Sequence, residues 1–253
     1  RQMCIRDSYR RLLRRNREID ELCEKLIKEY EGEGYDEKPV DIIGFVKNFL
    51  GLKLLIADFA EDNMNKIGFL ANGTDPLKIQ HNGKVTEHIF PEKTIVIDRC
   101  LTQAHYRSKM MFTIAHEAYH YIDGLMSSSP AVSAFHQEFD EEYSYSVDEL
   151  HRFMSIWECQ ADRGAAALLM PRKLIMNLYD EFTNGECITV YGDNIMTESS
   201  REMIRSMAEY LGVSFTALFI RLKHLNLLEF EDFSKFVSDE LHLPKGGSSG
   251  YDG

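Results

Sequence analysis

The sequence has no long hydrophobic run, few cysteines and no excess of positive charge. No apolar stretch approaches the roughly 18 residues that a membrane-spanning helix needs, and the basic amino end carries no signal-peptide core. The five cysteines are scattered without a CxxC pair, which argues against a disulfide framework and favours reduced thiols. The formal net charge of −12 argues against nucleic acid or an anionic membrane as a partner. We therefore expect a cytoplasmic protein that contacts no membrane.

The composition that remains is that of a globular protein. Hydrophobic residues make up 44% of the 253 positions and charged residues 28%, which is enough apolar material for a buried core. Apolar residues recur with a helical period over about residues 8–30 and 39–50. Residues 53–98 contain short β-prone runs instead, and the HNGK stretch among them is a two-residue hairpin signal. We expect an α+β fold with a small, mostly antiparallel sheet.

The second half of the chain is mostly helical by its periodicity, with segments at about residues 103–126, 147–169, 171–182, 197–211 and 214–226. A Ser-rich acidic stretch at 127–146 predicts a surface loop. Residues 207–228 resemble a helix–turn–helix unit, with Ser214 placed to cap its second helix. The sequence thus divides into a first domain, a helical C-terminal region and a flexible tail, at residues 1–175, 176–243 and 244–253.

One short motif, AHEAYH at residues 115–120, has the pattern of a metal site. His116 and His120 stand four positions apart, so on a helix both imidazoles face one side and can reach one ion. Glu117 is placed to hydrogen-bond a water ligand of a zinc ion and to act as the general base. The alternative is a helix with two ordinary histidines. The apolar MMFTIA segment before the motif predicts a buried helix, in which unpaired polar groups are costly.

A zinc peptidase needs a third protein ligand, and the stretch WECQADRGAAALLMP offers one. Glu158 and Asp162 are spaced i, i+4 in this segment, for which we predict a helix. In the gluzincin arrangement, a glutamate on a later helix is the third ligand and an aspartate orients the first histidine. The sequence therefore predicts zinc ligands His116, His120 and Glu158, with Asp162 behind His116. The alternative is a solvated acidic pair near a helix start, which the helix dipole favours.

Two stretches of the chain resemble a known family. RSKMMFTIAHEAYHYIDG is similar to its F-T-x-A-H-E-x-x-H helix, and ECQADRGAAALLMP is similar to its E-x-x-A-N/D-x-x-A-x-x-L-L-M-P segment. The family is that of the ImmA/IrrE-type zinc metallo-endopeptidases, and the resemblance covers about residues 40–230. The family usually has Leu-Gly where this chain has Ala118 and Tyr119, and an aromatic residue where this chain has Gly164.

The resemblance implies a fold, an activity and a partner. It implies a zincin-like (gluzincin) first domain that binds zinc through His116, His120 and Glu158, with Glu117 as the catalytic base. Members of such a family typically cleave a helix–turn–helix transcriptional repressor, often one encoded nearby, so we expect limited proteolysis of such a repressor. An edge strand would hold the substrate extended, and the KTIVID segment, residues 93–98, is the candidate.

Two other functions stay open from the sequence. A regulatory protein could keep the zinc fold and act by docking, with residues 207–228 contacting a protein or DNA. Its charges do not favour DNA, because nearby acidic residues offset Arg221 and Lys223. A general digestive peptidase is the third possibility, and the absence of a disulfide framework and an export signal argues against it. No oxyanion-stabilising residue is singled out, and the candidates are Tyr121, Tyr143, Tyr145 and His151.

Overall fold

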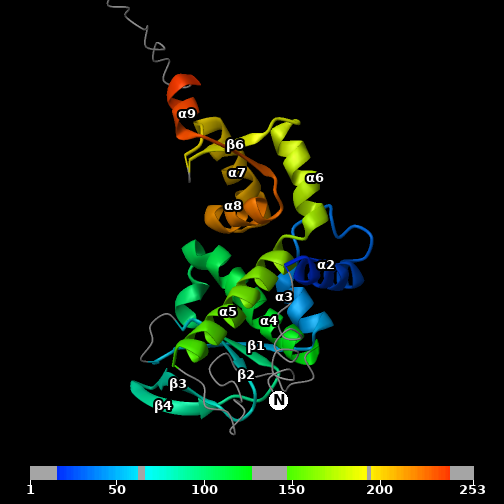
Figure 1. Ribbon diagram of the computed structural model, residues 1–253. Helices are drawn as coiled ribbons and strands as arrows, with labels where there is room; N and C mark the ends of the chain where they lie inside the picture. The colour runs from blue at the N-terminus through cyan, green and yellow to red at the C-terminus, as the bar shows by residue number, and fades with distance from the viewer. Residues whose placement is uncertain (1–15, 62–65, 127–146, 193–194, 240–253) are drawn as a thin grey trace, which may run out of the picture.

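A computed structural model describes residues 16–61, 66–126, 147–192 and 195–239. Helices and small sheets alternate along this part of the chain, which confirms the α+β class (Figure 1). The expected loop at 127–146, the flexible tail and the start of the first predicted helix lie outside the described residues.

The largest sheet has three strands in the order β1–β5–β2, namely Lys53–Ala57, Thr94–Asp98 and Gly68–Ala71. β1 runs parallel to β5 and β2 runs antiparallel to it, so this sheet is mixed rather than mostly antiparallel. The prediction that the KTIVID segment forms an edge strand is wrong, because β5 is paired on both sides. Its residues from Thr94 to Ile97 are all buried, and such a continuous apolar run is typical of a strand covered on both faces.

The HNGK signal is confirmed as a hairpin between β3 (Pro76–His81) and β4 (Lys84–Ile89). Asn82 and Gly83 have φ of 50° and 74°, the left-handed backbone that a type I′ turn requires at both central positions. Leu77 of the hairpin packs with Phe69 and Val96, while Ile95 of β5 belongs to the main core. The hairpin therefore covers one face of the three-stranded sheet and leaves the other to the helices.

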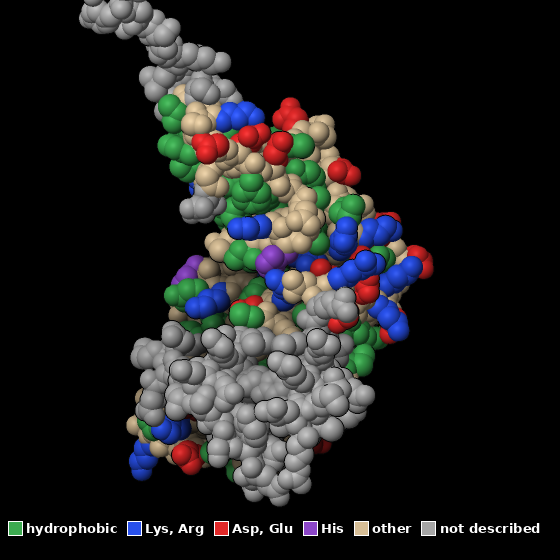
Figure 2. All heavy atoms as spheres, in the orientation of Figure 1, with side chains coloured by type: hydrophobic (Ala, Val, Ile, Leu, Met, Phe, Trp, Pro, Cys, Tyr) green, Lys and Arg blue, Asp and Glu red, His purple; other side chains and the backbone are tan. Residues whose placement is uncertain are grey.

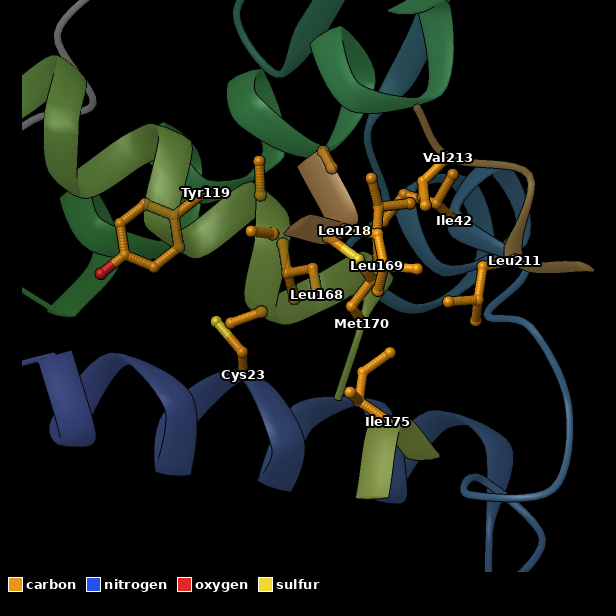
Figure 3. Packing of buried hydrophobic residues seen from close by; sticks show 14 of the residues in the cluster. Cys23, Ile42, Tyr119, Leu168, Leu169, Met170, Ile175, Leu211, Val213 and Leu218 are labelled. Atoms are coloured by element: carbon orange, nitrogen blue, oxygen red, sulfur yellow. The ribbon is translucent and has the colours of Figure 1, made fainter. Parts of the chain in front are cut away.

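Three helices cover that other face in layers: α2 (Asn16–Glu31), α4 (Arg107–Met126) and α5 (Val147–Leu169). α4 packs between the sheet and α5, and α2 packs against α5 (Figure 1). Cys23, Leu168 and Met170 come together in this core, near Tyr119 of α4 (Figure 3). Shorter turns connect these layers: α3 (Ile42–Gly44), the π-helical η1 (Phe45–Phe49), and the 3-10 turns η2 (Arg99–Thr102) and η3 (Ala104–Tyr106).

The described residues of the C-terminal part form four helices, three of them at the predicted positions, and a strand pair that the sequence did not predict. Its elements are α6 (Arg172–Thr183), β6 (Ile188–Tyr191), α7 (Glu198–Leu211), α8 (Phe215–His224), β7 (Leu228–Glu231) and α9 (Phe233–Asp239). Gly212, with φ of 68°, ends α7, and the Ser214 side chain accepts a hydrogen bond from the Ala217 N–H as expected. α7 and α8 bend by 105°, which lies in the range of helix–turn–helix units.

No single helix in the described ranges has both the length and the hydropathy for crossing a membrane. The α7–α8 pair meets that test of length and composition only when its two bent helices are joined. The face of the molecule that Figure 2 shows carries both basic and acidic side chains, and they are densest in the region of α2.

A buried arginine joins the C-terminal helices to the first part of the chain. Arg221 of α8 is 1% exposed, and its Nε donates to the Met170 carbonyl at 3.0 Å while its Nη1 pairs with Asp20 of α2. α8 is therefore fixed against the end of α5 and against α2. The boundary between the two predicted regions, after residue 175, falls inside α6 and stays a prediction.

Candidate metal centre

Two histidines of α4 point at the same place. His116 and His120 lie one helical turn apart, as their spacing predicted, and their side chains are 16% and 11% exposed. Their Nε2 atoms are only 3.1 Å apart. This distance fits a hydrogen bond in which one Nε2–H points at the lone pair of the other ring, and it also fits two nitrogens that share one metal ion.

Glu158 of α5 completes the cluster. Its Oε2 lies 3.1 Å from His116 Nε2, and its Oε1 lies 3.6 Å from His120 Nε2. In a tetrahedral zinc site with bonds of about 2.0–2.1 Å, adjacent donor atoms stand about 3.3 Å apart. The three donor groups therefore already have the spacing and the N/N/O chemistry that zinc takes, and together they form a group able to hold a metal ion.

Asp162 stands one turn after Glu158 on the same face of α5. Its Oδ1 is 2.9 Å from His116 Nδ1, the ring nitrogen that faces away from the cluster. A carboxylate in this position accepts the Nδ1–H and so leaves Nε2 with its lone pair free for a metal. The structure brings together the residues that the sequence predicted as ligands and as their support.

Charge within the cluster depends on these contacts. Burial would lower the pKa of His116, but its hydrogen bonds to Asp162 and Glu158 raise the pKa to about 10. Burial and the positive His116 lower the pKa of His120 to about 4. Burial opposes ionisation of Glu158, yet the His116 hydrogen bond and both rings lower its pKa below the usual value. Without a metal, a proton on His116 supplies the positive charge.

Glu117 is buried beside the cluster, against strand β2. Burial raises its pKa to about 7, although the His116 charge acts in the opposite direction. The carboxyl group has a hydrogen bond with the Leu70 backbone, while its Oε2 is buried with no hydrogen-bond partner in the described structure. A carboxyl group with a pKa near 7 and one oxygen without a hydrogen-bond partner is suited to accept and return a proton.

Two of the three residues that depart from the pattern of the resembled family, Tyr119 and Gly164, lie against each other. A Cβ added to Gly164 of α5 would come within 2.0 Å of the Tyr119 ring of α4. The Tyr119 ring therefore occupies the space that a side chain at residue 164 would fill. The close contact lies on the same two helices, α4 and α5, that carry His116, His120 and Glu158.

The structure does not identify an oxyanion-stabilising residue among the four candidates from the sequence. Tyr121 is buried in the main core at 7% exposed. The structure of Tyr143 and Tyr145 and the side chain of His151 lie outside the described part of the chain.

The sequence did not single out Gly68 or the Leu70 backbone, which both contact the Glu117 carboxyl. An isolated glycine inside a β-prone run was the available signal, because it often marks a close approach of another group.

Comparison of the chain with models of known protein families and with curated proteins gives no match. The resemblance to the ImmA/IrrE-type peptidases therefore rests on the two motifs, and it stays a prediction.

Proposed function

We propose that this chain is a zinc-dependent endopeptidase of the gluzincin type. The observation that supports this most is the convergence of His116, His120 and Glu158 at the donor spacing of a tetrahedral zinc site. Three protein ligands leave one position for a water or substrate, which is the composition of catalytic rather than structural zinc sites. The buried carboxyl of Glu117 beside the cluster adds the proton acceptor that hydrolysis needs.

Each residue has a separate task in the proposed hydrolysis. His116, His120 and Glu158 bind the ion, and Asp162 holds the His116 ring in the tautomer that can bind. A zinc ion supplies Lewis-acid polarisation of a carbonyl and lowers the pKa of a bound water to about 7. Glu117 takes the proton from the attacking water and delivers it to the departing amine, so its carboxyl returns to the ionised state.

The proposed substrate is an extended segment of a helix–turn–helix repressor, encoded near this chain. β2 is an outer strand of the three-stranded sheet, and its backbone contacts Glu117. A peptide added beside β2 would run past the ligand cluster, with main-chain hydrogen bonds holding it extended. β2 thus replaces the central strand β5 as the candidate docking edge.

The helix–turn–helix geometry of α7 and α8 raises DNA docking as a second function. The buried position of Arg221 opposes it, because one of the two basic residues expected on that surface is bonded to Asp20 and Met170 instead. We therefore assign α8 to packing against α2 and the end of α5, with α7 packed on α8, and propose that the protein acts on its partner by cleavage.

Metal content tests the ligand assignment directly. The purified protein is expected to hold about one zinc per chain, and alanine at His116, His120 or Glu158 is expected to abolish this binding. His81→Ala is the matched control, since His81 is an exposed histidine on the β3–β4 hairpin. Retention of zinc by all three alanine variants would contradict the assignment.

Cleavage tests the activity. Incubation with the neighbouring repressor is expected to produce defined fragments, which a chelator suppresses and added zinc restores. Repressor that stays intact but binds the protein would favour the docking function instead.

A further inference from the structure

Strand β2 touches the Glu117 side chain through a residue that has no side chain of its own. A Cβ placed on Gly68 would lie 2.8 Å from Glu117 Oε1 and 3.2 Å from Glu117 Cγ. It would also lie 2.5 Å from the Thr113 methyl group, one helical turn earlier on α4. Real Cβ atoms essentially never come closer than 3.0 Å to such neighbours, so any other residue at Gly68 must displace Glu117, Thr113 or the strand.

The backbone at Gly68 does not itself require glycine. Gly68 has no positive φ, and it pairs in regular antiparallel register with Ile97 of β5. An alanine could adopt this conformation, so conformational freedom does not explain the glycine. What remains is the space that the missing Cβ leaves for two side chains of α4, the Thr113 methyl and the Glu117 carboxyl.

We propose that Gly68 is a positioning residue for the catalytic carboxylate. The gap at Gly68 makes room for the Glu117 side chain against β2, where the carboxyl has a hydrogen bond with the Leu70 backbone and Oε2 is buried with no hydrogen-bond partner in the described structure. Glu117 is not a ligand, so its position relative to the metal depends on this contact with the strand. A methyl group at residue 68 would push the carboxyl away while the three ligands on α4 and α5 stay in place.

This inference rests on the proposed peptidase function, and two independent measurements test it. The first is a thermal-unfolding cycle that needs no substrate. Gly68→Ala is expected to lower the Tm by about 4–8 °C, the effect of overpacking in a chain of this size. The loss is expected to shrink in a Glu117→Ala background, and to shrink partly in a Thr113→Ser background as well, because that change removes the Thr113 methyl but leaves the Glu117 overlap. Gly34→Ala is the control, because a Cβ there meets its nearest neighbour at 3.6 Å.

The second measurement compares metal binding with turnover. Gly68→Ala is expected to keep its zinc and its KM for the repressor, while kcat falls by about 10²-fold, as displaced catalytic groups typically cause. Wild-type kcat in Gly68→Ala, or an equal Tm loss with and without the Glu117 side chain, would overturn the proposal. If the wild-type protein cleaves nothing, the peptidase function fails instead, and the unfolding cycle still reports whether Gly68 and Glu117 are in contact.

Discussion

A proton and a metal ion would compete for the same atom of His116, its Nε2 nitrogen. In the absence of metal its hydrogen bonds to Asp162 and Glu158 keep it protonated, with a pKa of about 10. A metal ion needs the Nε2 lone pair, so binding must expel that proton. The same carboxylates that stabilise the protonated ring also stabilise a bound cation, and they thereby keep the donor atoms in place before the metal arrives.

Zinc binding is therefore expected to release about one proton from His116 at pH 7.5. Because the pKa of His116 lies above this pH, the apparent affinity rises by about tenfold per pH unit between pH 6 and 8 from this group alone. Titration calorimetry in two buffers of different ionisation enthalpy measures the release. An affinity independent of pH, with no proton released, would contradict the account of His116.

Asp162 contacts His116 Nδ1 at 2.9 Å, so we expect any effect of Asp162 on a bound metal to pass through His116. Asp162→Asn is expected to weaken zinc binding by about 10–100-fold, the usual effect of losing a carboxylate behind a histidine ligand. Competition with a chromogenic chelator measures the affinity. The control is Asp180→Asn, which makes the same chemical substitution at an exposed aspartate of α6. Equal affinities for the two variants would show that the 2.9 Å contact has no role in metal binding.

The candidate site shows which residues a sequence can reveal. His116, His120, Glu158 and Asp162 follow from i, i+4 spacing, because helix geometry alone puts such pairs on one face. Gly68 contacts the site through the packing of β2 on α4, and no local spacing carries that information. The spacing in the sequence therefore identifies side chains that the structure brings together, whereas the strand beside Glu117 is seen only in the fold.

At the scale of elements, the contact between α4 and α5 determines whether the ligands meet. The Tyr119 ring lies over Gly164, where any side chain would collide with it. Glycine inside a helix normally lowers stability by roughly 0.5–1 kcal/mol relative to alanine. Its presence in the middle of α5 is therefore explained by the close approach of the two helices and not by helix propensity.

Gly164→Ala is expected to destabilise the protein by about 1–3 kcal/mol, as overpacked core substitutions do. The sign is diagnostic, since helix propensity alone predicts stabilisation by about 1 kcal/mol. Urea unfolding measures the change. In a Tyr119→Ala background the same substitution is expected to be neutral or stabilising. Stabilisation by Gly164→Ala in the wild-type background would refute the packing described for this helix pair.

The strands were harder to predict than the helices, because the pattern of a helix is local and the pairing of a strand is not. Each long helix carries its own 3.6-residue pattern, so α4, α5, α7 and α8 could be predicted within a few residues. A strand's neighbours are set by distant segments. The apolar run of β5 indicated a strand but not its central place, and the four-residue strands β6 and β7 were not recognised at all.

At the scale of the whole molecule, Arg221 connects parts of the chain about 200 residues apart. Its pairing with Asp20 is almost fully enclosed, with Arg221 1% exposed and the Asp20 side chain 18% exposed. Removing one member of a buried pair leaves the other charge without compensation. The position of α8 on α2 and α5 was not predicted, because charge in the sequence gave no sign that Arg221 is buried.

Asp20→Ala is therefore expected to lower the free energy of unfolding by about 3–5 kcal/mol, the usual effect of breaking a buried pair. Denaturant unfolding measures it, and zinc content is expected to stay at the wild-type level in the folded protein. Arg17→Ala, which removes an exposed ion pair with Glu21 on the same helix, serves as the control and is expected to change stability little. Equal stabilities of the two variants would contradict the connecting role of Arg221.

The central claim is that Glu117 is the base of a zinc peptidase, and Glu117→Gln tests it most directly. Glutamine keeps the size of the side chain but cannot take a proton. The variant is expected to bind about one zinc per chain, like the wild type. Its cleavage of the neighbouring repressor is expected to be about 10²–10⁴-fold slower than that of the wild type. Cleavage at the wild-type rate by the zinc-loaded variant would contradict the claim.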